Sequence, residues 1–408
     1  MPHVLHFKGI LWKFAGKGKS MVSLLSRLFI KDYTNYNDIQ VRRKYGILGS
    51  ITGIFLNVLL FVFKYFAGLA SGSVAIMADA FNNLSDAGSS IVTFAGFKVT
   101  GINPDDEHPF GHGRVEYISG FIVSIAIILM GFELLKTSAG KILHPSDIST
   151  STISFVILAI SVAVKLYMAF YNSSIGKKIN SAAMKATATD SLSDSAATLV
   201  VFLSMLVMKY TGINIDGYTG AIVAVFILFA GYNAAKDTIS PLLGTKPSKE
   251  IVETIDNIIM SHEGILGVHD LIVHDYGPGR MMVSLHAEVP GDRNIYELHN
   301  LIDHIENDLN DRFNCECVIH MDPVDINDSR VKEMRIETGK LVKSIDEKLS
   351  VHDLRIVPCK DYDNIIFDMI VPPGHYKKDE EIKEQVCKKI EEKYPGCKAV
   401  IKIDRSYI

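Results

Sequence analysis

The sequence lacks the motifs of nucleotide-driven and hydrolytic proteins. Its 408 residues contain no P-loop, no G-x-S-x-G and no H-E-x-x-H pattern, so ATP-driven pumping and hydrolysis have no support. A basic excess is also missing, since the formal net charge is -4 and the pI is about 6.4. Nucleic acid therefore has no electrostatic footprint on this chain. These absences leave an enzyme without support in the sequence and set nucleic acid aside as a partner.

Cysteine is scarce and confined to the polar C-terminal region, at Cys315, Cys317, Cys359, Cys387 and Cys397. In a cytosolic region these residues should be free thiols. The N-terminus has no short apolar core followed by a small-residue cleavage site, so we expect no cleaved leader. We interpret residues 1–20 as an accessory tail, because Met21 could equally be the natural start.

Long apolar segments are what the sequence does have. Hydrophobic residues make up 48% of the chain, and six runs are each long enough to cross a hydrocarbon core of roughly 30 Å. They lie at about 46–70, 74–97, 117–135, 152–170, 186–208 and 217–235. Residues 46–240 are therefore predicted to form a six-helix transmembrane domain embedded in membrane lipid.

Positive charge is distributed unevenly around these runs. Nine Lys or Arg residues lie between Lys8 and Lys44, whereas the loops near Lys141 and Lys209 hold one each. Cytoplasmic segments carry the excess of basic residues in membrane proteins. The N-terminal segment 1–45 is therefore predicted to be cytoplasmic, and an even number of spans returns the C-terminus to the same side of the plasma membrane.

A repeat follows the apolar region. The segment GVHDLIVHDYGPGRMMVSLHAEVP from Gly267 returns as SVHDLRIVPCKDYDNIIFDMIVPP from Ser350. Each copy has the pattern helix, strand, strand, helix, strand, which is typical of an α+β sandwich with helices on one sheet face. We predict a ferredoxin-like domain over 243–326, duplicated over 331–408. The overall fold class is thus an all-α membrane domain followed by an α+β cytoplasmic domain.

Acidic residues occur inside two of the apolar runs. The segment ADAFNNLSDAGSS carries Asp79, Asn82 and Asp86, and TATDSLSDSAAT carries Asp190 and Asp194. Residues with i, i+3 or i+4 spacing share one helix face. Each ionised Asp costs about 2.5 to 3.5 kcal/mol at mid-membrane, so the four acids cost roughly 10 kcal/mol unless something compensates their charge. This favours an ion or proton site over the alternative, a structural polar network between helices.

The proposed ligands Asn82, Asp86, Asp190 and Asp194 offer oxygen donors only, with Asp79 as an accessory transport or proton group. Imidazole and thiolate are absent from all six runs. Carboxylate and carbonyl oxygens suit Mn²⁺, Mg²⁺ or Ca²⁺, whereas zinc sites usually include His or Cys. Protons can compete with a divalent ion for the same carboxylates, and this competition is the physical basis of antiport.

These residues resemble a known family. Asn82 with Asp86, and Asp190 with Asp194, match the paired H-x-x-x-D or D-x-x-x-D signatures of the cation diffusion facilitators. The segment DDEHPFGHGRVE from Asp105 resembles that family's H-P-x-G-H-G-R motif. Replacement of His by Asn at position 82 and by Asp at position 190 is similar to the manganese-exporting branch.

The resemblance implies a homodimeric, proton-coupled exporter of divalent metal, Mn²⁺ foremost, with no permanently bound cofactor. It also implies that spans one, two, four and five form the ion-bearing bundle while spans three and six pair beside it. Two alternatives stay open: export of Zn²⁺, Fe²⁺ or Mg²⁺ by the same mechanism, and a membrane-anchored metal sensor. A sensor would leave the intramembrane acids unexplained.

Two further groups of residues could bind metal. After the second run, Asp105, His108 and His112 could hold an ion at the cytoplasmic mouth. The alternative is that this loop forms only a tight turn, with Arg114 and Glu116 in interhelical ion pairs.

In the first copy of the repeat, His269, His286, His320 and Asp322 resemble the family's cytoplasmic metal-sensing residues, and His299 is a further candidate. The second copy has His352, Asp368, Lys402 and Asp404 at the matching positions. Because it keeps the predicted fold without the full His set, packing alone does not require those histidines. A metal-binding role is therefore favoured for the first copy over the alternative of half-exposed strand residues.

Overall fold

A computed structural model describes residues 21–36, 38–71, 74–144, 152–325, 328–358, 362–372, 375 and 378–404. The predicted tail of residues 1–20 and the Cys359 thiol lie outside these residues. The chain divides into two compact units, Met1–Leu243 and Gly244–Ile408, which we call the helical unit and the α+β unit. Each unit has hydrophobic clusters of its own.

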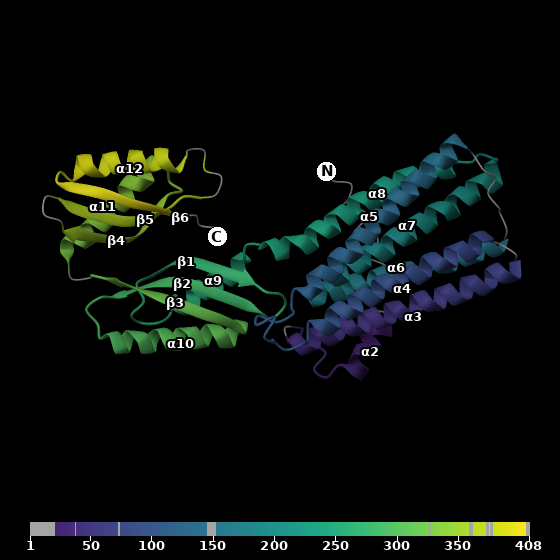
Figure 1. Ribbon diagram of the computed structural model, residues 1–408, viewed down its shortest axis with the longest axis horizontal. Coiled ribbons are helices and arrows are strands. Elements are labelled where there is room, and N and C mark those ends of the chain that lie inside the picture. Colours follow the sequence, from purple (N-terminus) through teal and green to yellow (C-terminus); the bar gives the residue numbers. More distant parts are fainter. Residues whose placement is uncertain are drawn as a thin grey trace. The chain divides into compact units, whose positions relative to one another are not determined.

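In its described part, the helical unit consists of α2 (Met21–Phe29), α3 (Ile39–Ser71), α4 (Val74–Val99), α5 (Val115–Leu143), α6 (Thr152–Lys178), α7 (Ala182–Thr211) and α8 (Asp216–Leu243) (Figure 1). The ends of α7 show why helices begin and stop where they do. The Ser181 side chain accepts the backbone N–H of Met184 as an N-cap, and Gly212 ends the helix with a left-handed φ of 71°.

Five helices of the described chain are long and apolar enough to cross a membrane, namely α3, α5, α6, α7 and α8. Helix α4 has 26 residues but falls short in apolarity, because Asp79, Asn82, Asn83 and Asp86 lie within it. The predicted spans are thus confirmed for five of the six runs. The remaining helix is the one that carries the first group of predicted ligands.

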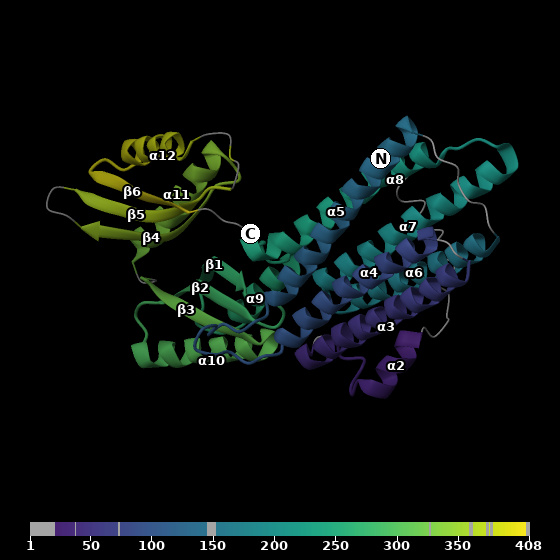
Figure 2. The same ribbon diagram turned by 45° about the vertical axis from the view of Figure 1, so that its right-hand side comes forward.

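The long helices pack in pairs, α3 with α4, α5 with α8 and α6 with α7 (Figure 1, Figure 2). Small residues allow the close approaches that membrane helices need. A Cβ atom on Gly120 of α5 would lie only 2.9 Å from Cα of Ala183 in α7. The partnership of α5 with α8 agrees with the expected pairing of the third and sixth runs.

A buried ion pair joins the ends of three helices. Arg42 of α3 donates from Nη1 and Nη2 to the two carboxylate oxygens of Glu116 in α5, at 2.5 and 2.8 Å. The Ser181 hydroxyl, at the start of α7, donates to Glu116 Oε1 at 2.6 Å. Arg42 Nε also donates to the Ile179 carbonyl. Glu116 is therefore in an interhelical ion pair, and its partner is Arg42.

We expect Glu116→Gln to lower the free energy of unfolding by about 3 to 5 kcal/mol, because it leaves the Arg42 guanidinium buried and unpaired. Thermal unfolding of the detergent-purified protein measures the loss. Lys340→Ala is the control, since it removes an exposed pair with Glu337 at 2.9 Å that contributes at most about 1 kcal/mol. Equal melting temperatures for the two variants would refute the assignment.

The α+β unit contains two subdomains with the same order of elements. The first comprises α9 (Lys249–Met260), β1 (Gly267–Asp275), β2 (Met281–Pro290), α10 (Ile295–Phe313) and β3 (Cys315–Val324). The second comprises α11 (Ser329–Ile345), β4 (Ser350–Pro358), β5 (Asp363–Ile370), α12 (Asp379–Lys393) and β6 (Cys397–Asp404). In both sheets the first two strands are antiparallel and the last two are parallel.

Side-chain alternation places the helices of each subdomain on one face of its sheet. In β2, Val283, Leu285 and Ala287 are buried in a cluster with residues of α9 and α10. His286 lies between them in sequence, so its side chain points to the opposite face. The register aligns His286 with His269 on β1 and His320 on β3, which makes a row of three histidines across the sheet.

The corresponding row of the second sheet is mixed in charge. The register aligns His352 on β4 with Asp368 on β5 and Lys402 on β6. Its core has the same plan, with Ile365 and Phe367 packed in one cluster with residues of α11 and α12. The two subdomains therefore share one backbone plan and differ in the chemistry of this row.

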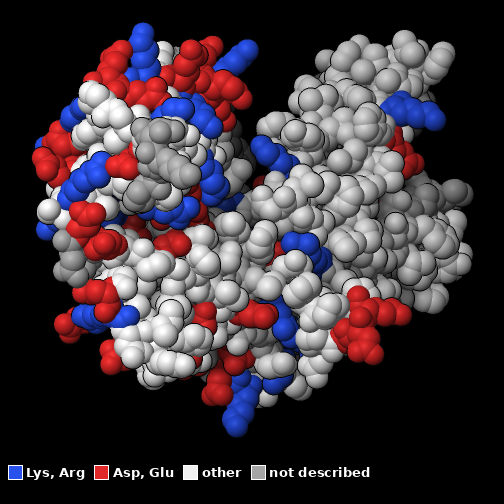
Figure 3. Space-filling model, turned by 60° about the vertical axis from the view of Figure 1, so that its left-hand side comes forward, with Lys and Arg blue, Asp and Glu red and all other residues white. Residues whose placement is uncertain are grey.

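The α+β unit has a charged surface and free thiols. Acidic and basic side chains are intermixed on the face shown in Figure 3. The four described cysteines, Cys315, Cys317, Cys387 and Cys397, are free, as predicted. Burial raises the pKa of the Cys317 thiol to about 12, so this residue remains protonated and packs as a small apolar side chain.

Candidate metal centres

Three helices bring one lysine and two aspartates together inside the helical unit. Lys165 of α6 donates from Nζ to Asp86 of α4 at 2.5 Å and to Asp194 of α7 at 2.7 Å. We call this group the lysine site. The Lys165 side chain is 4% exposed, so the two carboxylates replace water as the hydrogen-bond partners of its ammonium. The structure thus places a cation between two of the predicted metal ligands.

Sequence reasoning missed both lysines of this region. Besides Lys165, Lys64 of α3 lies with Nζ 2.8 Å from Asp79 Oδ2, and its side chain is 2% exposed. Each lysine lies inside an apolar run. The free-energy cost of burying a charge in the membrane, by which the acids were identified, therefore applies to the lysines as well. Asp79, predicted as an accessory group, is therefore the partner of a buried lysine.

The other two predicted ligands are placed differently. Asp190 is buried, at 7% exposed, one helical turn before Asp194 on α7. Asn82 is exposed on α4, one turn before Asp86. The structure therefore brings Asp86 and Asp194 together through Lys165, keeps Asp190 in the interior, and leaves Asn82 at the surface of this unit.

The neighbouring hydroxyl groups form hydrogen bonds both within and between helices. Ser191 donates to the Thr187 carbonyl of its own helix, and Thr93 of α4 donates to the Ser89 carbonyl in the same way. Two contacts do cross between helices: the Thr93 and Thr187 hydroxyls lie 3.0 Å apart, and the Asn57 amide of α3 donates to the Ser90 hydroxyl of α4 at 3.5 Å. Most of this hydrogen bonding is thus spent within single helices, and the charged groups supply the stronger links between them.

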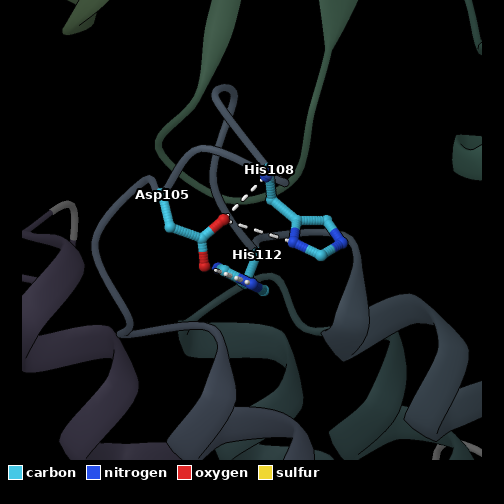
Figure 4. Close-up of side chains that lie close together, drawn as sticks. All are labelled: Asp105, His108 and His112. Carbon is cyan, nitrogen blue, oxygen red and sulfur yellow. Dashed lines mark hydrogen bonds and ion pairs between the residues drawn. The ribbon is translucent and has the colours of Figure 1, made fainter.

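The loop between α4 and α5 gathers the second predicted group (Figure 4). Asp105 Oδ1 lies 3.4 Å from His108 Nδ1, and Asp105 Oδ2 lies 3.6 Å from His112 Nε2. One ligand atom from each residue lies within 4.8 Å of the other two. Three donors that could hold a metal ion therefore converge on one point.

The same loop is also a tight turn, as the alternative interpretation required. The Gly111 N–H donates to the His108 carbonyl at 2.8 Å, and Gly111 has a φ of 78°. The His108 backbone N–H donates to Asp105 at 2.7 Å. This bond, with smaller contributions from the His112 and His108 side chains, lowers the pKa of Asp105. Turn and donor cluster thus coexist, because the turn itself orients the carboxylate.

In the first subdomain, the sheet face opposite the helices carries the third predicted group. Asp322 Oδ2 lies 2.9 Å from His286 Nδ1 and 3.2 Å from His269 Nε2. Asp322 Oδ1 lies 3.5 Å from His320 Nε2. The Asp322 carboxylate therefore lies at the centre of the histidine row, within reach of all three rings.

His299 does not join this group within the chain. It lies on α10 and pairs with Asp303 one turn later, at 3.2 Å. Helix α10 packs on the face of the sheet opposite to the histidine row. Within one chain, the sheet therefore lies between His299 and the histidine row, and the role of His299 as a further ligand stays a prediction.

A long apolar helical unit with buried charges, joined to an α+β unit rich in histidine, defines a membrane transporter for metal cations. Comparison with known families agrees. Residues 50–243 match the cation efflux transmembrane domain, and residues 247–324 match the cytoplasmic domain of cation efflux proteins. The chain belongs to the cation efflux family, the cation diffusion facilitators. Members of this family are transporters of divalent metals rather than enzymes.

Characterised and uncharacterised relatives span most of the chain. An uncharacterized transporter of Methanocaldococcus jannaschii is 31% identical over 276 residues, which cover 67% of this chain and 97% of the relative. A manganese efflux system protein of Bacillus subtilis is 25% identical, with coverages of 69% and 97%. A cadmium, cobalt and zinc/H⁺-K⁺ antiporter of Bacillus velezensis is 26% identical, with coverages of 64% and 83%.

We expect the double change His286→Ala with His320→Ala to weaken metal binding by the α+β unit about tenfold or more, because it removes two of the donors around Asp322. Calorimetry with Zn²⁺ and with Mn²⁺ on the purified full-length protein measures the affinity. His299→Ala is the matched control and should bind as the wild type does. Unchanged titrations of the double variant with both ions would support half-exposed strand residues instead.

Proposed function

We propose that this protein exports a divalent metal cation, Mn²⁺ foremost, from the cytoplasm in exchange for protons. Asn82, Asp86, Asp190 and Asp194 form the transport site. The protein resides in the plasma membrane as a homodimer, with both termini in the cytoplasm. The two subdomains of the α+β unit are copies of one domain, and the first of them senses metal.

The observation that carries this proposal is the lysine site. Two carboxylates on different helices converge within 2.7 Å of a single ammonium, which is the arrangement a divalent ion would need. Because the ammonium is attached by a flexible stem, it can withdraw when an ion enters. Lys165 is then a tethered competitor that fills the position when the ion has left.

Counting Lys165 changes the charge balance of the site. Asp86, Asp190 and Asp194 contribute -3, and the ammonium reduces the total to -2 provided that Lys165 withdraws only from the position of the ion and stays beside the carboxylates. One divalent ion or two protons neutralise that charge. The proposal therefore implies an exchange of two protons for one ion, with no net movement of charge across the membrane.

Ion pairing also explains how α4, the second of the six predicted spans, can cross the membrane although its composition is too polar. Its acidic residues make it too polar by composition, but Asp79 is paired with Lys64 of α3 and Asp86 with Lys165 of α6. Neutralisation by neighbouring helices removes much of the cost of burying these groups. A helix that merely anchored a sensor would gain nothing from such pairs.

The manganese assignment rests on donor chemistry, supported by relatives. The four predicted ligands are oxygen donors, which tolerate six-coordination and retained water, whereas imidazole favours a compact tetrahedral zinc site. Two relatives from Bacillus subtilis are named manganese efflux system proteins, and they are 25% identical to this chain.

We expect Asp86→Asn or Asp194→Asn to abolish metal uptake by reconstituted vesicles, because each change removes one of the carboxylates that bind the ion. The readout is metal-dependent proton flux, measured with Mn²⁺, Fe²⁺, Zn²⁺, Mg²⁺ and Co²⁺. Asp216→Asn is the matched control. It breaks a 2.6 Å pair with Lys141 that lies outside the lysine site, so transport should persist.

The same vesicles test the charge balance. Two protons should move for each metal ion, and the rate should not respond to an imposed membrane potential. Wild-type flux in the Asp86→Asn or Asp194→Asn variant would refute the site. Metal flux without proton movement would refute antiport while leaving the site intact.

Exchanging oxygen for nitrogen donors should change selectivity. We expect Asn82→His combined with Asp190→His to shift the flux ratio from Mn²⁺ toward Zn²⁺, with each single change intermediate. Raw affinity already favours Zn²⁺ at almost any fixed set of donors, so geometry must supply the preference for Mn²⁺. The ratio is measured at matched free-ion activity. A wild type that prefers Zn²⁺, or a ratio unaltered by the double change, would overturn the manganese assignment.

A further inference from the structure

The two subdomains of the α+β unit meet at a pair of buried histidines. The rings of His269 on β1 and His352 on β4 have centroids 4.4 Å apart. Arg335 of α11 adds a second link, with Nη2 at 2.5 Å from both carboxylate oxygens of Glu288 on β2. Side chains of both subdomains are therefore brought together at one interface.

Three potential metal ligands converge at this interface. Asp270, His352 and Asp404 each place one ligand atom within 4.8 Å of the other two. His352 Nε2 lies 3.9 Å from Asp270 Oδ1. Asp270 belongs to β1, whereas His352 and Asp404 belong to β4 and β6, so neither subdomain has the complete set.

The histidines at this interface lack the hydrogen bonds that buried imidazoles need. His352 is 7% exposed, and neither of its ring nitrogens has a hydrogen-bond partner among the described residues. Both ring nitrogens of His269 also lack a hydrogen-bond partner among the described residues. His269 Nε2 lies 3.2 Å from Asp322 Oδ2, but the geometry is not that of a hydrogen bond. An unpaired buried polar group costs about 1 to 3 kcal/mol. A cation bound at a nitrogen lone pair would offset that cost.

The backbone places a carboxylate at the same point of both subdomains. Asp270 and Asp353 have left-handed φ values of 52° and 50°, at matching irregularities in the pairing of β1 and β4. Such bulges redirect a side chain. In β1 the bulge brings the Asp270 carboxylate toward His352 of the other subdomain.

The charges around this cluster match a divalent ion. Asp270 and Asp404 contribute two negative charges, and His352 is a neutral donor when it binds metal. Lys402 lies 3.2 Å from Asp404, but its side chain is 65% exposed. An exposed ion pair contributes about 0 to 1 kcal/mol, so an incoming ion can displace this lysine.

We propose that Asp270, His352 and Asp404 bind a divalent transition-metal cation that joins the two subdomains. Imidazole and carboxylate donors together suit Zn²⁺ and Mn²⁺. None of the three belongs to the cluster formed by His286, His320 and Asp322, although Asp270 also lies in a further group with His269 and His286. Among these groups, His352 and Asp404 occur in the interface site alone. The interface site is independent of transport, and it gives the second subdomain a function that its own row of residues does not suggest.

The first test counts bound Zn²⁺ per full-length chain by equilibrium dialysis and elemental analysis. His352→Asn and Asp404→Asn should each lose one ion, or bind it about tenfold more weakly or worse, and the double variant should lose no more. His286→Ala with His320→Ala should remove a different ion, so that its loss adds to that of Asp404→Asn. His299→Ala should leave the count unchanged.

The second test shows whether the ion joins the subdomains. Zn²⁺ should slow hydrogen exchange in β4 and β6, and Asp270→Asn, a change in the first subdomain, should abolish that protection in the second. If His352→Asn fails to fold, the number of Zn²⁺ ions bound by Asp404→Asn tests the site instead. Asp404 is only partly buried, so its substitution should leave the fold intact. Wild-type Zn²⁺ counts in Asp404→Asn, or β4 and β6 protection that survives Asp270→Asn, would overturn the proposal.

Discussion

Burial of charge in a medium of low dielectric constant is the constraint on which the helical unit depends. An isolated ion cannot be accommodated inside the membrane at acceptable cost. The acids Asp79, Asp86 and Asp194 accordingly each have a lysine ammonium within 2.8 Å. Because every such pair joins two different helices, charge neutralisation also links the helices of this unit.

Two kinds of buried ion pair in this unit suit two different purposes. Arg42 holds Glu116 with a planar, bidentate guanidinium, and Ser181 completes the hydrogen bonding of the carboxylate. Such geometry is rigid and suits a permanent structural link between helices. Lys165 is instead a point charge on a flexible stem, shared between two carboxylates. A single ammonium shared between two carboxylates is suited to exchange with another cation.

The α+β unit shows how one backbone plan can serve two chemical purposes. The row of His269, His286 and His320 surrounds one carboxylate in the first subdomain. The second subdomain keeps the register but replaces two of these histidines with Asp368 and Lys402, which pair with each other at 3.1 Å. An internal ion pair thus occupies the positions that correspond to His286 and His320 of the first subdomain. The remaining His352 is then available to the interface.

The sequence by itself determined the features that depend on local pattern. Apolar length predicted six spans, of which five are confirmed, and i, i+4 spacing placed Asp86 on one helix face with Asn82, and Asp194 on one face with Asp190. These features follow from the periods of helix and strand, which are properties of short segments. The repeated segment likewise predicted two subdomains with the same order of elements.

Only the tertiary structure decided which charges meet. Lys165 is 79 residues from Asp86 and 29 residues from Asp194, and no local period relates them. Their contact depends on how α4, α6 and α7 pack, and that packing is set by side-chain fit and by the charges themselves. The same reason applies to His352, whose approach to Asp270 depends on the docking of two separately formed sheets. Partners brought together by packing are therefore the part of this protein that sequence patterns could not predict.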